Sequence, residues 1–158
     1  MGDNRDTYYP MNGAQLKSGV ICKWLPFLCN KGASYATLSD HPDDYMVVSG
    51  INHSKTNRAV YSSLTIIGVK KLMCVGGVND VEFEDSAQVY MGNDDPIADY
   101  FYSYIFARNC TGRGKFCYEV VSEGEVSISL SDLIVFVERG YINPVTHIGG
   151  DRSEIIPP

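Results

Sequence analysis

The sequence of 158 residues lacks the features that most directly assign a protein to a membrane or to an enzyme class. Its apolar runs are each broken by polar residues within a few positions, so none is long enough to cross a bilayer. The first residues, MGDNRDTYYP, have neither the basic nor the apolar region of a secretory signal peptide. No G-x-S-x-G sequence is present, which removes one common signature of a serine nucleophile.

Positive charge is also scarce. The 13 Lys and Arg residues are outnumbered by 19 Asp and Glu, for a net charge of -6. The only adjacent basic pair is Lys70 and Lys71. Nucleic acids and anionic lipid surfaces both attract clustered cations, so neither is an expected partner.

What the sequence does contain is the composition of one globular domain. Hydrophobic residues make up 44% and charged residues 20%, at a length typical of a single domain. Eleven Tyr accompany six Phe and one Trp. Because Tyr and Phe pack well on a pleated surface, this aromatic content favours β-strands.

Four of the five cysteines form two local pairs, Cys22 with Cys29 and Cys110 with Cys117. Pro26 can turn the first loop, and two glycines can supply the backbone angles of the second. We therefore predict two disulfide-closed loops and a buried free thiol at Cys74. Free buried thiols are the alternative; zinc fits poorly, because structural zinc pairs are usually closer in sequence.

Two sequons for N-linked glycosylation occur, at Asn52 and Asn109. Both fall where the sequence predicts turns, and Asn109 directly precedes the Cys110 loop. Disulfides and sequons are independent indications of the secretory route. The sequence thus predicts an extracellular or cell-surface glycoprotein, whose leader was removed or whose chain is a segment of a longer protein.

The predicted fold is mainly β, an antiparallel β-sandwich or barrel with disulfide-closed loops. Residues 1–18 are polar and irregular and are expected to form an extended N-terminal arm, followed by a single β-rich domain over residues 19–158. Short apolar or alternating runs separated by Gly, Asp and Pro turns predict the strands. These are Tyr45–Ile51, Arg58–Val69, Leu72–Val75 before a turn at Gly76-Gly77, Val78–Tyr90, Ala98–Arg108, Phe116–Val121, Glu125–Leu130 and Leu133–Glu138, the last two pairing as a hairpin.

Two groups of side chains are candidate binding sites. Tyr100, Tyr102 and Tyr104 alternate along one strand and could present a row of rings to a glycan or a protein; the alternative is that they line the core. Asp94, Asp95 and Asp99 flank one loop and could bind calcium, although their spacing matches no EF-hand. The alternative for these carboxylates is a solvated acidic edge that discourages aggregation.

No cofactor is implied other than this possible calcium ion, and no set of residues predicts catalysis. His41 and His53 with Asp43 or Asp44 could in principle bind a transition metal. A turn role for His41 and a solvated loop for His53 are the favoured interpretations.

We therefore expect a non-enzymatic extracellular structural or interaction domain. It could be a self-assembling subunit of a cell-surface or fibrous assembly, with copies of itself or other parts of that assembly as partners. Strand exchange through the N-terminal arm is the expected mode of assembly. The alternative is a secreted carbohydrate-binding or carbohydrate-cleaving domain in which the Tyr row contacts the sugar. Such a domain could depend on calcium.

Overall fold

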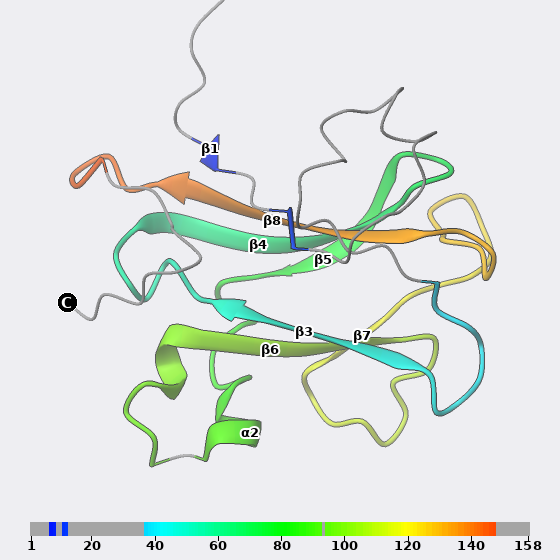
Figure 1. The fold of residues 1–158 in the computed structure, drawn as a ribbon, viewed down its shortest axis with the longest axis horizontal. Helices are drawn as coiled ribbons and strands as arrows, with labels where there is room; N and C mark the ends of the chain where they lie inside the picture. The colour runs from blue at the N-terminus through cyan, green and yellow to red at the C-terminus, as the bar shows by residue number, and fades with distance from the viewer. Residues whose placement is uncertain (1–6, 9–10, 13–36, 93, 148–158) are drawn as a thin grey trace, which may run out of the picture.

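The computed structural model describes residues 7–8, 11–12, 37–92 and 94–147. Over these residues the protein is mainly β, with two small sheets and little helix (Figure 1). The elements are β1 (Thr7–Tyr8), β2 (Met11–Asn12), β3 (Tyr45–Ile51), β4 (Ala59–Gly68), β5 (Met73–Asn79), α2 (Gln88–Met91), η2 (Ala98–Tyr100), β6 (Phe101–Ala107), β7 (Cys117–Glu119) and β8 (Ile134–Ile142).

The larger sheet is antiparallel and is built on β4 and β8, its two long strands. β5 pairs with the other side of β4, and the short strands β1 and β2 pair with the other side of β8. The register of β4 shifts between Ile66 and Ile67 against β5, a local irregularity that increases strand twist. The strand predicted at Arg58–Val69 is thus β4, which spans Ala59–Gly68.

The smaller sheet has the order β3-β6-β7. β3 covers the predicted range of residues 45–51 and pairs with β6 in antiparallel register, with Ser49 opposite Ser103. β7, however, runs parallel to β6, so the expectation of a fully antiparallel fold is wrong for this strand. The Gly-containing loop between them brings the chain back to the level of Ile105, so that β7 begins opposite Ile105 and continues in the direction of β6.

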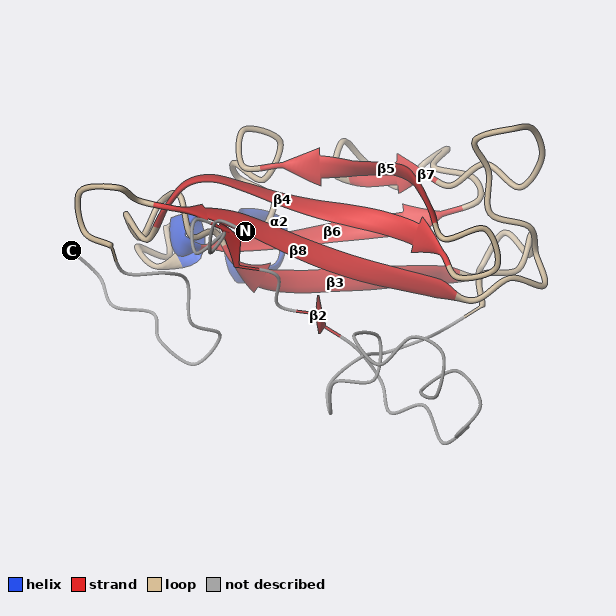
Figure 2. Ribbon diagram, turned by 90° about the horizontal axis from the view of Figure 1, so that it is seen from above, coloured by secondary structure: helices blue, strands red, loops and turns tan. Residues whose placement is uncertain are grey.

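One hydrophobic core contains side chains from both sheets. Leu64 and Ile66 from β4 and Phe136 from β8 are buried together with Tyr102 and Phe106 from β6. The rings of Phe106 and Phe136 lie 4.7 Å apart between centroids. Figure 2 shows the long strands of the two sheets extending along one another. The described strand pairings close neither sheet on itself, so they form no barrel.

The predicted turn at Gly76-Gly77 is wrong, because both residues lie within β5. A Cβ atom on Gly77 would collide with the carbonyl oxygen of Leu64, and one on Gly76 would collide with the hydroxyl of Tyr118. The two glycines are therefore needed because β4 and the Tyr118 side chain approach β5 closely. A glycine within a strand often marks such a close approach and need not indicate a turn.

Two further strand predictions are wrong. After β5, residues 80–87 form turns that lead into α2, and Phe83 enters the core, where it stacks on Tyr102 at 4.1 Å between centroids. Residues 125–130 form no strand, although Ile128 is fully buried. The predicted hairpin is therefore absent, and β8 pairs with β4 instead. No helix in the described part of the chain is long and apolar enough to span a membrane.

Candidate functional site

The loop between β6 and β7 is closed by a disulfide between Cys110 and Cys117, as the sequence predicts. Their Cα atoms are 5.7 Å apart, within the normal range for a disulfide. Gly112 and Gly114 have φ angles of 76° and 80°, which L side chains rarely adopt. The two glycines thus allow the tight path of the loop that the disulfide closes.

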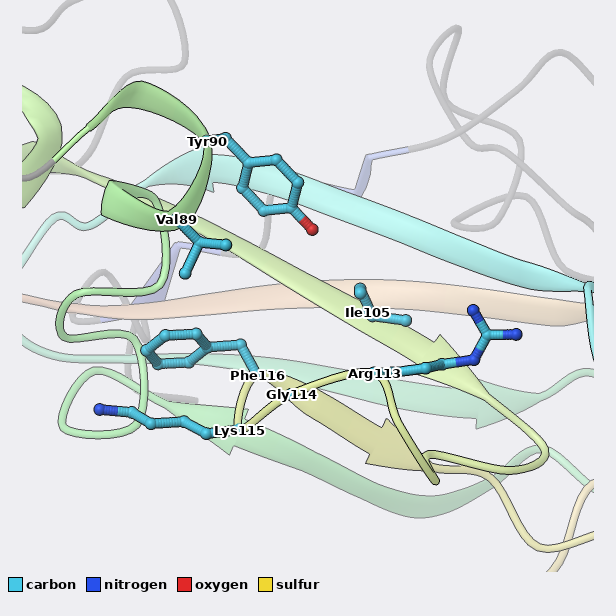
Figure 3. A pocket seen from close by; sticks show the side chains of 7 residues that line it. All are labelled: Val89, Tyr90, Ile105, Arg113, Gly114, Lys115 and Phe116. Carbon is cyan, nitrogen blue, oxygen red and sulfur yellow. The ribbon is translucent and has the colours of Figure 1, made fainter.

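Beside this loop is a pocket of about 280 Å³ on the outer side of the smaller sheet (Figure 3). Four apolar or aromatic side chains line it: Val89 and Tyr90 from α2, Ile105 from β6, and Phe116 from the disulfide loop. The amide of Ile105 donates a hydrogen bond of 2.9 Å to the carbonyl of Phe116, which fixes the loop against the strand. The pocket therefore has walls from three separate segments.

Arg113, Gly114 and Lys115 complete the lining, and two of them bring positive charge to the pocket. The Lys115 ammonium lies 4.6 Å from the centroid of the Phe116 ring, and the Arg113 guanidinium lies 4.6 Å from that of Tyr45. Figure 3 shows the two cationic groups pointing in opposite directions. Within the described residues, neither cation lies within ion-pair distance of a carboxylate. The pocket therefore carries two positive charges that no carboxylate of the described residues neutralises.

The backbone also holds Arg113 in place. Its Nε donates to the carbonyl of Asn109 at 3.2 Å, and its Nη2 donates to the carbonyl of Pro42. The first bond is local to the disulfide loop, and the second joins this loop to the turn that precedes β3. No corresponding hydrogen bond of the Lys115 ammonium occurs within the described residues, so Lys115 is the more adaptable of the two cations.

None of the described residues lining the pocket is a Ser, Cys, His, Asp or Glu. A nucleophile with a positioned base is therefore not part of this lining. The apolar surface and the two cations are suited to binding, with hydrophobic burial supplying affinity and charge supplying selectivity.

Sequence reasoning missed this pocket, because its parts lie at residues 89–90, 105 and 113–116. One signal was present: Arg113 and Lys115 are alternate residues inside a disulfide-closed, glycine-containing loop of an acidic chain. A constrained loop of this kind presents its side chains in fixed positions, as many binding loops do.

The predicted Tyr row does not form a surface platform. Tyr102 is 0% and Tyr104 7% exposed, and both rings lie in the core, while Tyr100 precedes the strand in η2. Burial raises the pKa of the Tyr104 phenol, with a smaller contribution from Glu82. The alternation along β6 was correct, but the face that carries these rings points inward, so a glycan cannot stack on Tyr102 or Tyr104 in this fold.

Asp94, Asp95 and Asp99 are not gathered around a common point. Asp95 accepts a hydrogen bond from the amide of Ile97 at 3.1 Å, and Asp99 accepts one from the side chain of Gln88 at 2.8 Å. Nowhere in residues 37–92 or 94–147 do three or more His, Cys, Asp or Glu side chains form a group that could hold a metal ion.

The two sequons differ in accessibility. Asn109 is exposed, and its side-chain oxygen accepts a bond of 2.8 Å from the amide of Thr111. Asn52 is only 1% exposed, and its Nδ2 atom, to which a glycan would be attached, is enclosed by the protein. The predicted glycan at Asn52 therefore does not fit this fold, whereas one at Asn109 does.

Cys74 is a free cysteine on β5 and is exposed, so the prediction of a buried thiol is wrong. It lies on the strand at the edge of the larger sheet, where only one side of the strand is paired. The predicted pair of Cys22 and Cys29 lies outside the described residues.

The other edge of the larger sheet is formed by β8 with β1 and β2. Thr7 is opposite Tyr141 and Tyr8 opposite Gly140, while Met11 and Asn12 are opposite Val137 and Phe136. The remaining residues of the predicted arm, 1–6, 9–10 and 13–18, lie outside the described part of the chain. Two-residue ladders of this kind contribute few hydrogen bonds each.

Comparison with known proteins assigns no family: no family model, curated protein or solved structure matches the chain. The pocket and the edges of the larger sheet are therefore the features of this chain that bear on its function.

Proposed function

We propose that this chain is a non-enzymatic extracellular interaction domain, a β-sandwich whose copies assemble by exchanging their N-terminal strands. The observation that carries the proposal is the pairing of β1 and β2 with the outer edge of β8. A sheet edge that accepts strands from a remote part of the chain can accept the same strands from a second copy.

Such an exchange costs little in contacts. Residues 13–36 separate β2 from the next described segment, a length of chain sufficient for β1 and β2 to reach a neighbouring molecule. The hydrogen bonds to β8 would be the same in the exchanged form, so only the entropy of association opposes it. Short ladders open readily, which makes the exchange kinetically accessible.

The disulfide at Cys110–Cys117 supports the extracellular part of the proposal, because disulfides persist mainly in oxidising compartments. The exposed sequon at Asn109, beside this disulfide, is consistent with the same route. A cell-surface or fibrous assembly is the setting in which repeated strand exchange would be useful.

Cysteine crosslinking between two different variants tests the exchange. One variant carries Thr7→Cys and the other Tyr141→Cys, both in a Cys74→Ser background that removes the exposed native thiol. The positions are direct partners across the antiparallel ladder, at a spacing that a disulfide can bridge. After the variants are mixed and oxidised, we expect a covalent dimer whose 7–141 linkage is found by peptide mass spectrometry.

Two controls define the result. A mixture of Thr7→Cys with Val121→Cys, an exposed position in a loop, should give no specific linkage. The double variant Thr7→Cys/Tyr141→Cys reports pairing within one chain. If it forms the 7–141 disulfide only within the monomer, and the mixture of single variants forms none, strand exchange is not how this protein works.

A further inference from the structure

The pocket beside the disulfide loop is a second candidate binding site, and its structure does not depend on strand exchange. Its floor is apolar, from Val89, Ile105 and Phe116, and its rim carries Arg113 and Lys115 (Figure 3). The disulfide and the hydrogen bond between Ile105 and Phe116 fix the loop that contributes both cations. The site is therefore formed before any ligand arrives.

The charge of the rim is opposite to that of the protein as a whole. The chain has a net charge of -6, yet the only ionic groups among the described lining residues are Arg113 and Lys115. A cation held over an aromatic ring keeps its outward N–H groups free to donate, and charge-assisted hydrogen bonds to carboxylates are among the strongest available. The complementary ligand is thus anionic at one end and apolar at the other.

The size of the pocket limits the ligand. A volume of about 280 Å³ is close to the lower end of the range for small-molecule sites, room for one ring with a short chain. Four apolar or aromatic side chains are too few for the core of an ordinary protein–protein interface. These dimensions favour a small molecule over a folded partner.

We propose that this pocket binds a small organic carboxylate, with its ring or short aliphatic chain on Ile105 and Phe116 and its carboxylate against Lys115. Tyr90 and Val89 cover the apolar part of the ligand from the α2 side. Arg113, whose Nε and Nη2 already donate to backbone carbonyls, mainly maintains the loop and adds to the positive potential.

The test compares 3-phenylpropionate with 3-phenylpropanamide, which has nearly the same shape but no charge. Both are titrated into the full ¹⁵N-labelled chain, and amide chemical shifts are followed by NMR. We expect the acid to bind with a Kd on the order of millimolar, since so small a ligand makes few contacts. The shifts should centre on Ile105, Lys115 and Phe116, and the amide should bind less tightly.

Three variants separate charge from packing. Lys115→Gln should weaken binding of the acid about threefold or more while leaving the amide unchanged, and Lys115→Arg should retain it. Ile105→Phe should fill the pocket and weaken binding of both ligands. Lys70→Gln, which removes an exposed cation elsewhere, is the matched control and should bind like the native chain.

Salt provides an independent readout, because added salt should weaken binding of the acid and not of the amide. Equal affinity for acid and amide, or shifts centred elsewhere on the protein, would overturn the proposal. The absence of shifts with either ligand would do the same, as would binding of an acidic peptide when the free acid does not bind.

Discussion

The guanidinium of Arg108, the residue that follows β6, donates hydrogen bonds to the backbone carbonyl of Leu38 from both Nε and Nη2, each at 3.1 Å. Further bonds from the same group reach the carbonyls of Val120, Val121 and Ser129. Leu38 and Val120 are fully buried, although neither lies in a strand. One side chain therefore satisfies carbonyl groups in three irregular segments that cover the core.

Replacement of Arg108 should destabilise the protein strongly. Arg108→Ala leaves several of these carbonyls without a donor, and we expect a loss of about 2 kcal/mol or more in the free energy of unfolding. Arg108→Lys should recover only part of it, because an ammonium cannot reproduce the planar fork of donors. Urea denaturation measures both, with Lys70→Gln as the control. A change within experimental error for Arg108→Ala would show that water replaces the guanidinium at no cost.

Two glycines in the larger sheet should respond differently to substitution by alanine. A Cβ on Gly77 would collide with the carbonyl of Leu64 and lie 2.9 Å from the Cα of Thr65, whereas the first atom met from Gly140 is 3.6 Å away. Gly77→Ala should therefore cost about 1–3 kcal/mol, because relief requires moving β5 away from β4. Gly140→Ala should be nearly neutral. Thermal unfolding of the two variants measures this difference in stability. Equal melting temperatures would show that the β4 backbone yields to a Cβ atom at Gly77 without cost.

Stability should fall on acidification in a way that depends on Asp44. Hydrogen bonds from the side chain and then the backbone of Ser39 hold the pKa of this carboxyl below its usual value, with the Ser39 amide 2.8 Å from Oδ2. Because the folded-state pKa is lowered, the stabilisation is complete above the unfolded-state pKa near 3.8 and is lost as pH falls through the lower folded-state pKa.

Asp44→Asn should accordingly flatten the decrease in unfolding free energy between about pH 5 and pH 3. Ser39→Ala removes the hydroxyl but keeps the amide, so its unfolding free energy should depend on pH to an intermediate degree. Denaturation at a series of pH values tests this order. If the unfolding free energy of Asp44→Asn depends on pH as steeply as that of the native chain, the hydrogen bonds from Ser39 to Asp44 do not stabilise the folded state.

Removal of the disulfide should affect both stability and the pocket. Cys110→Ser/Cys117→Ser should lower the free energy of unfolding by about 2–3 kcal/mol, the value expected for so short a loop. Because Arg113, Lys115 and Phe116 all lie between the two cysteines, binding of 3-phenylpropionate should weaken as well. Cys74→Ser is the matched control. Unchanged ligand affinity in the double variant would show that the pocket does not depend on the disulfide.

The two sequons should behave differently in a eukaryotic secretory host. We expect a glycan at the exposed Asn109 and none at the enclosed Asn52, so Asn109→Gln should abolish the added mass and Asn52→Gln should leave it unchanged. Intact mass spectrometry before and after glycosidase treatment makes the comparison. Glycan on Asn52 would mean that the loop after β3 adopts a different conformation during secretion.

Local sequence information was sufficient for features that depend on neighbouring residues only. The cysteines at 110 and 117 with intervening glycines predicted a closed loop, because a short flexible segment can bring its own ends together. The β-favouring residues of Tyr45–Ile51 likewise predicted β3 at its observed limits. Alternation along β6 correctly placed Tyr102 and Tyr104 on the same face of the strand.

Features that depend on residues far apart in the sequence could not be predicted from local sequence patterns. Alternation cannot say which face of β6 is buried; Phe136 and Leu64, from the other sheet, decide it. Gly76 and Gly77 suggested a turn, but the reason for them is the proximity of Tyr118 and of the β4 backbone.

The polar sequence around Asn52 predicted an exposed turn, yet the loop packs against the rest of the fold and encloses the side chain.

The sequence by itself determined the mainly β character, the Cys110–Cys117 loop and the acidic charge of this protein, because each of these follows from composition or from residues close together in the chain. The pairing of β8 with β1, β2 and β4, and the meeting of Val89, Ile105 and Lys115 in one pocket, were decided only by tertiary structure. Those contacts join segments far apart in sequence, and they form where burial of the shared core offsets the entropy lost in bringing such segments together.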